Sequence, residues 1–196
     1  MCIRDSLITG WFLSKKQDSH TKSRLFGGSS REILKYGENP HQVASYLNSP
    51  DLERKAKYLL KILQGALSYN NLADTTAAYK ILCELEDYNK SSCVIIKHGN
   101  PCGVAIDNKI LGAYKKSFET DPISAFGGIV AVNQKVDEKL AKRILSVFTE
   151  VIIAKSFSPE AFKMLSFKKN IKIVEIKSFD RTLLHTEAVS YTHLTL

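Results

Sequence analysis

The feature that most constrains the fold of this chain is an alternation, from about residue 66 onward, between short apolar runs and segments of helical periodicity. The apolar runs have the length of β-strands and occupy residues 92–96, 128–132, 151–154 and 171–176. Strands that alternate with helices are typical of βαβ units. We therefore predict an α/β fold with a largely parallel sheet and flanking helices.

The segments between the apolar runs carry the signals of helices. One predicted helix begins at Asp74 and another spans residues 110–118. A further helix begins at Ser158-Pro159, because serine is a good N-cap residue and proline fits the first helical turn. Between these, one face of a predicted helix gathers Leu140, Ala141, Ile144, Leu145 and Phe148.

The two ends of the chain lie outside this pattern. The first part is polar and contains Gly27-Gly28-Ser29-Ser30, so the fold is expected to begin near Arg31. The stretches 1–6 and 189–196 resemble adaptor-derived ends. We predict a non-native end plus linker over residues 1–30, a folded region over 31–188 and a second non-native end over 189–196.

Composition argues against several classes of protein. No run of about 18 apolar residues and no convincing signal peptide is present, so the cytosol is the expected compartment. The 4 cysteines have no C-x-x-C spacing, and we expect reduced thiols. The excess of 28 Lys and Arg over 20 Asp and Glu favours an anionic partner. Because the lysines are scattered without interleaved aromatic residues, the case for nucleic acid is weaker than that for a phosphorylated metabolite.

Lys97 and His98 form the first candidate site. They stand at the carboxyl end of an apolar run that Gly99 then breaks, and ligands of open α/β sheets bind at that edge. A neutral histidine is a natural proton acceptor near pH 7, and a neighbouring ammonium can stabilise an oxyanion. Together they suit acyl or formyl transfer to an amine. The alternative is structural, with His98 in a turn and Lys97 as a solvated charge.

His98, Pro101 and Cys102 also invite comparison with zinc deaminases, whose signature is H-x-E followed later by P-C-x-x-C. Asn100 stands in place of the glutamate and Ala105 in place of the second cysteine. The spacing between the two halves is also too short. We therefore expect no catalytic metal.

Two other places in the chain offer contacts to a ligand. Lys35 and Tyr36 provide a cation and a phenol for a phosphate group, and an ordinary turn with an exposed lysine is the alternative. Gly127 lies before an apolar run, so it belongs to no P-loop; bare backbone there allows close approach of a ligand, and a tight turn is the alternative. Glu150 could accept hydrogen bonds from a ribose or an amide, and a surface carboxylate is the alternative.

Three short segments are rich in Gly, Pro, Asn and His: YGENPHQ at residues 36–42, KHGNPCG at 97–103 and DPISAFGG at 121–128. Taken in this order, they resemble AICAR transformylase. The resemblance is supported by QG at residues 64–65, SYNN at 68–71 and EVIIA at 150–154. The motifs keep the family's order and cover roughly residues 31–178.

The resemblance implies a reaction. The family transfers a formyl group from 10-formyltetrahydrofolate to the 5-amino group of AICAR, giving FAICAR on the route to IMP, and needs no metal for the transfer. His98 would be the proton acceptor, and Lys97 would stabilise the charge on the formyl oxygen. Lys35, where the family usually has arginine, and Tyr36 would hold the nucleotide. Gly127 and Glu150, at a position where some members carry aspartate, would also bind it.

The resemblance further implies a cytidine-deaminase-like fold without zinc and a homodimer with sites built across the interface. An IMP cyclohydrolase domain would precede the chain, and much of the folate pocket would follow residue 188. The chain alone is therefore expected to be inactive. The alternative is a non-catalytic nucleotide-binding α/β module. A nucleic-acid-binding protein would rest only on the net charge of +8.

Overall fold

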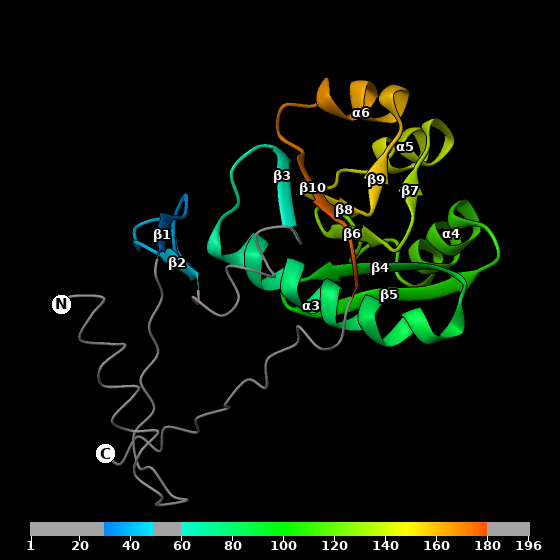
Figure 1. Cartoon of the computed structure of the whole chain (residues 1–196), viewed down its shortest axis with the longest axis horizontal. Helices are drawn as coiled ribbons and strands as arrows, with labels where there is room; N and C mark the ends of the chain where they lie inside the picture. The colour runs from blue at the N-terminus through cyan, green and yellow to red at the C-terminus, as the bar shows by residue number, and fades with distance from the viewer. Residues whose placement is uncertain (1–29, 49–59, 180–196) are drawn as a thin grey trace, which may run out of the picture.

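The computed structural model describes residues 30–48 and 60–179, which form an α/β structure around a six-stranded sheet (Figure 1). The strand order in this sheet is β3-β10-β8-β6-β4-β5. The proposed non-native ends and linker lie outside the described residues, apart from Ser30. Within the described part of the chain, no helix is both long enough and apolar enough to span a membrane.

The elements of the large sheet and its helices follow one another along the chain. The strands are β3 (Leu60–Gln64), β4 (Ser91–Lys97), β5 (Asn100–Asp107), β6 (Ile129–Val132), β8 (Val151–Ala154) and β10 (Lys172–Ile176). The helices are α3 (Tyr69–Leu85), the short η1 (Glu86–Tyr88), α4 (Ile110–Thr120), α5 (Glu138–Leu145) and α6 (Pro159–Ser166). Two small sheets pair β1 (Ser30–Ile33) with β2 (Ser45–Asn48) and β7 (Lys135–Val136) with β9 (Ser156–Phe157).

The sheet is mixed, which corrects the expectation of a largely parallel one. Strands β6, β8 and β10 are parallel, as expected from the helical connections between them. Strand β4 runs antiparallel to both β5 and β6, and β3 runs antiparallel to β10. The physical reason at β4 and β5 is their connection: a tight hairpin turn can only join antiparallel strands, whereas parallel strands need a long crossover.

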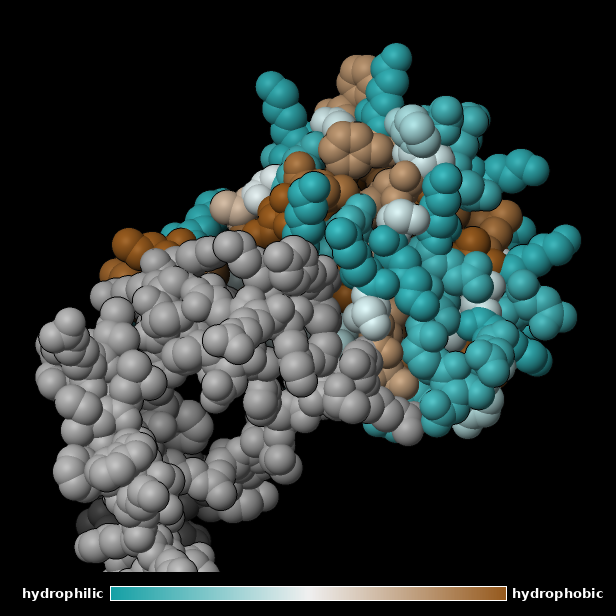
Figure 2. Space-filling model, viewed as in Figure 1, coloured by the Kyte–Doolittle hydropathy of each residue, from teal (hydrophilic) through white to brown (hydrophobic). Residues whose placement is uncertain are grey.

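Helices cover both faces of the sheet (Figure 1). Helix α3 packs on one face, where Ala78 and Leu82 meet Val94 and Ile153. Helices α4, α5 and α6 pack on the other face and bury the alternate residues of the same strands. Figure 2 shows mostly hydrophilic residues on the side of the molecule where α4 and α5 lie. The apolar sides of these helices therefore face the sheet, as their periodicity requires.

Two helix boundaries differ from the sequence expectation. Helix α3 begins at Tyr69 and not at Asp74, because Ser68 caps it and forms a reciprocal capping box with Asn71. Helix α5 ends at Leu145, so Phe148 does not belong to its apolar face; its side chain is 47% exposed. The expected start of α6 is confirmed, since the Ser158 side chain accepts a hydrogen bond from the Ala161 N–H and Pro159 opens the helix.

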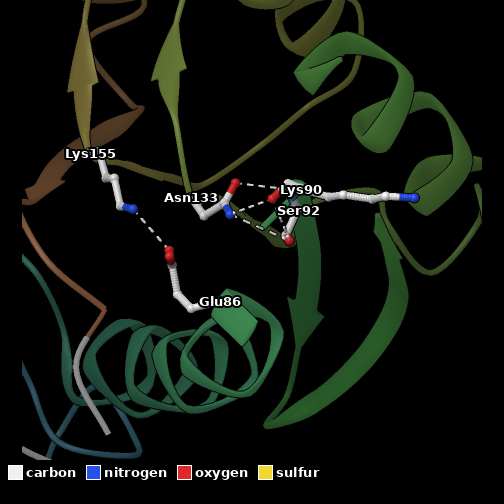
Figure 3. A network of polar contacts seen from close by, with 5 residues as sticks. All are labelled: Glu86, Lys90, Ser92, Asn133 and Lys155. Carbon is white, nitrogen blue, oxygen red and sulfur yellow. Dashed lines mark hydrogen bonds and ion pairs between the residues drawn. The ribbon is translucent and has the colours of Figure 1, made fainter. Parts of the chain in front are cut away.

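A buried asparagine fixes the start of β4 against β6 (Figure 3). The Asn133 side chain accepts a hydrogen bond from the Ser92 N–H at 2.8 Å and donates one to the Lys90 carbonyl at 2.8 Å. Asn133 is only 4% exposed. Nearby, Lys155 forms an ion pair of 2.9 Å with Glu86 and so links the end of β8 to η1 (Figure 3).

Replacing Asn133 with alanine should lower the free energy of unfolding by about 1–3 kcal/mol, because buried backbone groups lose their partners. Urea unfolding followed by circular dichroism measures this change. The matched control is Gln134→Ala, an exposed neighbour that should change stability by about 0.5 kcal/mol or less. Equal effects of both substitutions would contradict the assigned role of Asn133.

Candidate functional site

The candidate residues gather at one edge of the large sheet. Lys97 is the last residue of β4, and the register pairs Ile96 with Ile129, Ile129 with Val151, and Val151 with Lys172. The carboxyl end of antiparallel β4 therefore lies beside the amino ends of β6, β8 and β10. The sequence analysis expected a site at the carboxyl ends of the strands. Lys97 is at the carboxyl end of its own strand, but it lies beside the amino ends of the three parallel strands.

His98 and Gly99 form the two-residue turn between β4 and β5. The expected break at Gly99 is thus a hairpin, and Asn100 and Pro101 belong to the next strand. Both turn residues are left-handed, with φ of 53° at His98 and 75° at Gly99, as the favoured hairpin turns require. A non-glycine residue in this conformation costs about 1–2 kcal/mol. The turn leaves the His98 side chain exposed at the tip of the hairpin.

Lys97 is anchored to a loop from another part of the chain. Its ammonium donates a hydrogen bond of 2.7 Å to the carbonyl of Phe126, which is 29 residues away in sequence. An ammonium carries three N–H donors, so this bond leaves two for other partners. The Lys97 side chain is therefore fixed in place while it keeps the capacity to bind an oxygen atom of a ligand.

Gly127 and Gly128 connect this loop to β6. Gly127 has a φ of 74°, and its N–H donates a hydrogen bond of 2.8 Å to the carbonyl of Phe148. At Gly128 a Cβ would lie 2.8 Å from the Ile96 carbonyl, closer than real contacts allow. Gly127 therefore needs its glycine for conformation and Gly128 for space. The rings of Phe126 and Phe148 lie 5.4 Å apart beside this backbone.

Glu150 stands immediately before β8 and is held by two side chains. Its Oε2 accepts a hydrogen bond of 3.0 Å from the Asn71 amide and lies 3.7 Å from the Lys172 ammonium. Its backbone N–H donates to the Gly128 carbonyl at 3.0 Å. The side chain remains 40% exposed. Glu150 is thus more than a solvated surface carboxylate, because its orientation is fixed from α3 and β10.

Lys35 and Tyr36 lie against the start of α3. The Tyr36 carbonyl accepts a hydrogen bond of 3.2 Å from the Tyr69 N–H, and the Lys35 N–H contacts the Leu67 carbonyl at 3.5 Å. The Lys35 ammonium lies 5.7 Å from the centre of the Tyr36 ring. The same helix start supplies Asn71 to Glu150, so α3 connects this segment with the sheet edge.

The structure therefore brings Lys97, Gly127 and Glu150 to one edge and joins Lys35 and Tyr36 to it through α3. The sequence analysis assigned no role to Asn71 or Lys172 as partners of Glu150. Asn71 carried one usable signal: it stands three residues after Ser68, the spacing of a capping box. No local pattern pointed to Lys172, which meets Glu150 only through the pairing of β8 and β10.

Charged groups at this edge of the sheet change the pKa of Cys102 on β5. Partial burial raises the pKa of the Cys102 thiol, Asp121 and Asp74 raise it further, and the Lys97 ammonium opposes them. The pKa of Asp121 itself is lowered, chiefly by a hydrogen bond from Ser124. Among the described residues Cys83, Cys93 and Cys102 form no disulfide, and no cluster of three or more His, Cys, Asp or Glu could hold a metal ion. Cys2 lies outside the described residues.

Cys102 can report on the charge of Lys97. Replacing Lys97 with methionine should raise the pKa of Cys102 further, because the thiolate loses a stabilising cation, and should slow alkylation at pH 8 by about twofold to threefold, as expected for a charge partly screened by solvent. Asp121→Asn should change the rate in the opposite direction. The rate of reaction with iodoacetamide, measured by mass spectrometry in a Cys2→Ser background, tests both.

The control for this measurement is Lys163→Met, an exposed lysine on α6, which packs against α5. It should leave the alkylation rate unchanged. Cys83 and Cys93 are 1% and 0% exposed and should not react in the folded protein. If Lys97→Met and Lys163→Met gave the same rate, Lys97 would not lie close enough to Cys102 to affect its pKa.

Comparison with solved structures gives only weak likeness. Acinetobacter baumannii RibD, form 1, has a TM-score of 0.44 at 14% identity, over 54% of this chain and 35% of that chain. A structure described as a putative formate dehydrogenase accessory protein from Desulfotalea psychrophila has a TM-score of 0.45 at 12% identity, over 79% of this chain and 85% of that chain. Both TM-scores are too low to establish a shared fold, so the deaminase-like fold stays a prediction.

Comparison of sequences gives a much closer similarity than comparison of structures. The bifunctional purine biosynthesis protein PurH of Mesorhizobium japonicum is 43% identical over 171 residues, which cover 87% of this chain and 32% of that protein. The protein of the same name from Bradyrhizobium diazoefficiens is 42% identical over 171 residues. The chain thus spans about a third of the length of these curated relatives, at 32%. A family model described as AICARFT/IMPCHase bienzyme matches residues 2–195, and the chain belongs to that family.

Proposed function

We propose that the protein acts in purine biosynthesis and that this chain carries part of an AICAR formyltransferase site. The reaction is transfer of the formyl group of 10-formyltetrahydrofolate to the 5-amino group of AICAR, giving FAICAR and tetrahydrofolate. Family membership and the names of the relatives, which are bifunctional purine biosynthesis proteins, support the purine role. The residues at the sheet edge support the specific chemistry.

The observation that carries the proposal is the convergence of distant segments on one edge. The Lys97 ammonium reaches a loop carbonyl 29 residues away, and Glu150 is bound by a side chain 79 residues away. The exposed imidazole of His98 stands next to Lys97 in the hairpin turn. A fixed cation beside an accessible base is the combination that acyl transfer to a weakly basic amine needs.

In the proposed reaction the amine nitrogen of AICAR attacks the formyl carbon, a C–N bond forms, and the carbonyl electron pair moves onto oxygen. Lys97 stabilises this oxyanion with an N–H that is not used by the Phe126 carbonyl. His98 accepts the proton that the amine nitrogen loses. When the oxyanion collapses, the bond from carbon to the N10 atom of the folate breaks, and N10 takes up a proton as it leaves.

The nucleotide is proposed to lie between the glycine loop and the start of α3. Lys35 and Tyr36 would bind its charged and polar groups, and Gly127 would let it approach bare backbone. Only Oε2 of Glu150 contacts Asn71 and Lys172, so Oε1 is the natural acceptor for a ribose hydroxyl. No metal takes part in this scheme, and neither nucleic acid nor a membrane is a proposed partner.

The remaining parts of the proposal concern the whole protein. We expect a cytosolic homodimer with sites built across the interface, in which other segments supply most of the folate contacts. The second activity of the family, IMP cyclohydrolase, is proposed for the full-length protein and is assigned to no residue of this chain. On this proposal the isolated chain has no transferase activity.

The central test uses AICAR-dependent release of tetrahydrofolate by the full-length protein, followed by absorbance. His98→Ala and Lys97→Ala should each lower kcat by about 10²-fold or more, because loss of a general base or of oxyanion stabilisation costs rates of that order. Absence of turnover by the folded, unmutated protein would favour a nucleotide-binding module without catalysis.

His98→Asn separates catalysis from folding. Asparagine accepts the left-handed conformation well, so the free energy of unfolding should stay within about 0.5 kcal/mol of the unmutated value while activity is lost. Urea unfolding and the transferase assay on the same preparation measure both. Retained activity in this variant would remove His98 from the proposed mechanism.

Lys35→Arg tests the nucleotide contact. Arginine offers a planar pair of donors that can bind phosphate or carboxamide at two points, whereas lysine is a single point charge. The variant should therefore lower the KM for AICAR by about threefold to tenfold, a gain of about 1 kcal/mol, with little change in kcat. Lys35→Met should raise the KM. If both variants left the KM unchanged, Lys35 would not contact the nucleotide.

A further inference from the structure

Asp74 makes a contact to which the proposed chemistry assigns no role. It lies on α3, and its Oδ1 accepts a hydrogen bond of 2.6 Å from the backbone N–H of Gly99. Gly99 is the second residue of the hairpin turn that carries His98. The contact joins residues 25 apart in sequence and ties a helix to the tip of a hairpin.

The turn needs such a tie because its backbone conformation is unusual. His98 is one of two non-glycine residues with positive φ in the described part of the chain. Left-handed conformations of this kind persist when surrounding contacts hold them in place. Inside the hairpin, the Asn100 side chain donates a hydrogen bond of 3.0 Å to the His98 carbonyl. Asp74 supplies a second tie, from outside the hairpin.

The position of Asp74 suits this role. It is partly buried on α3, the same helix whose Asn71 holds Glu150, so one rigid element contacts both the hairpin tip and the start of β8. A hydrogen bond from a backbone N–H to a carboxylate is among the stronger kinds. The negative charge of Asp74 also acts at the edge of the sheet: together with Asp121, it raises the pKa of Cys102.

We propose that Asp74 is a positioning residue, which holds the Lys97-His98 hairpin in register with the glycine loop and Glu150 through the Gly99 N–H. This inference rests on the proposed function, because it assigns Asp74 to the geometry of that site. Asp74 acts on the backbone of the turn and not on the substrate. Its loss therefore frees the hairpin tip and leaves the nucleotide contacts of Lys35 and Glu150 in place.

The expected signature is a split between kinetic constants. Asp74→Ala should lower kcat by about 10- to 100-fold, since a displacement of catalytic groups by about 1 Å has effects of that size. The KM for AICAR should change by less than about threefold, because the binding groups are untouched. Asp74→Asn keeps an oxygen acceptor of the same length and should restore most of kcat.

A second measurement follows the turn itself. Hydrogen exchange of peptides covering residues 97–100, measured by mass spectrometry on the full-length protein, should become about tenfold faster in Asp74→Ala, because the Gly99 amide loses its acceptor. Peptides covering β6 and β8 should keep the exchange rates of the unmutated protein. Thr76→Ala, an exposed position on the same helix, is the control and should alter neither kcat nor exchange at the turn.

The two measurements keep this inference separable from the proposed function. Unchanged exchange at residues 97–100 in Asp74→Ala, or faster exchange with unchanged kcat, would overturn the positioning role. Failure of the proposed function would instead appear as absence of AICAR turnover in the unmutated protein. If Asp74→Ala did not fold, a full loss of kcat in well-folded Asp74→Asn would also overturn the inference, because that variant keeps the acceptor.

Discussion

Strands β4, β6, β8 and β10 are covered on both faces, by α3 on one side and by α4, α5 and α6 on the other. The middle residues of β4, β6 and β8 are therefore apolar, since neither alternating set of their side chains meets water, whereas β10 keeps the partly buried Glu175. Burial of a single aliphatic side chain is worth about 1.5–3 kcal/mol, so the sum over these strands dominates the stability of the fold. The same constraint moves polar side chains to the strand ends.

This constraint explains which elements could be predicted from the sequence. Continuous apolar runs mark β4, β6 and β8, and segment 171–176, in which Lys172 and Glu175 interrupt the apolar residues, marks β10. All four strands were found close to their observed bounds. Strand β5 was missed because it is only partly buried and begins with Asn100-Pro101, residues that usually end a strand. The start of α3 was missed for a related reason: its first turns are polar, and only the cap at Ser68 marks them.

The candidate site was predictable in its parts but not in its connections. Lys97, His98 and Gly127 stood out because histidine and glycine at the ends of apolar runs are typical of ligand sites. Their partners depend on strand order and direction, which no local pattern contains. Lys172 meets Glu150 only because β10 lies beside β8, and the Phe126 carbonyl meets Lys97 only because β4 runs opposite to β6.

The antiparallel direction of β4 has a further consequence for the charges at this edge. It brings the carboxyl end of one strand to the amino ends of three others, and the amino end of α3 lies there too, since Asn71 of its first turn binds Glu150. The amino end of a helix carries a partial positive charge that favours nearby carboxylates. Glu150, held by Asn71 of the first turn, is placed to benefit. Helix α3, which covers one face of the sheet, therefore also holds Glu150 through Asn71 and the hairpin turn through Asp74. The packing of the core and the arrangement of the site both depend on this helix.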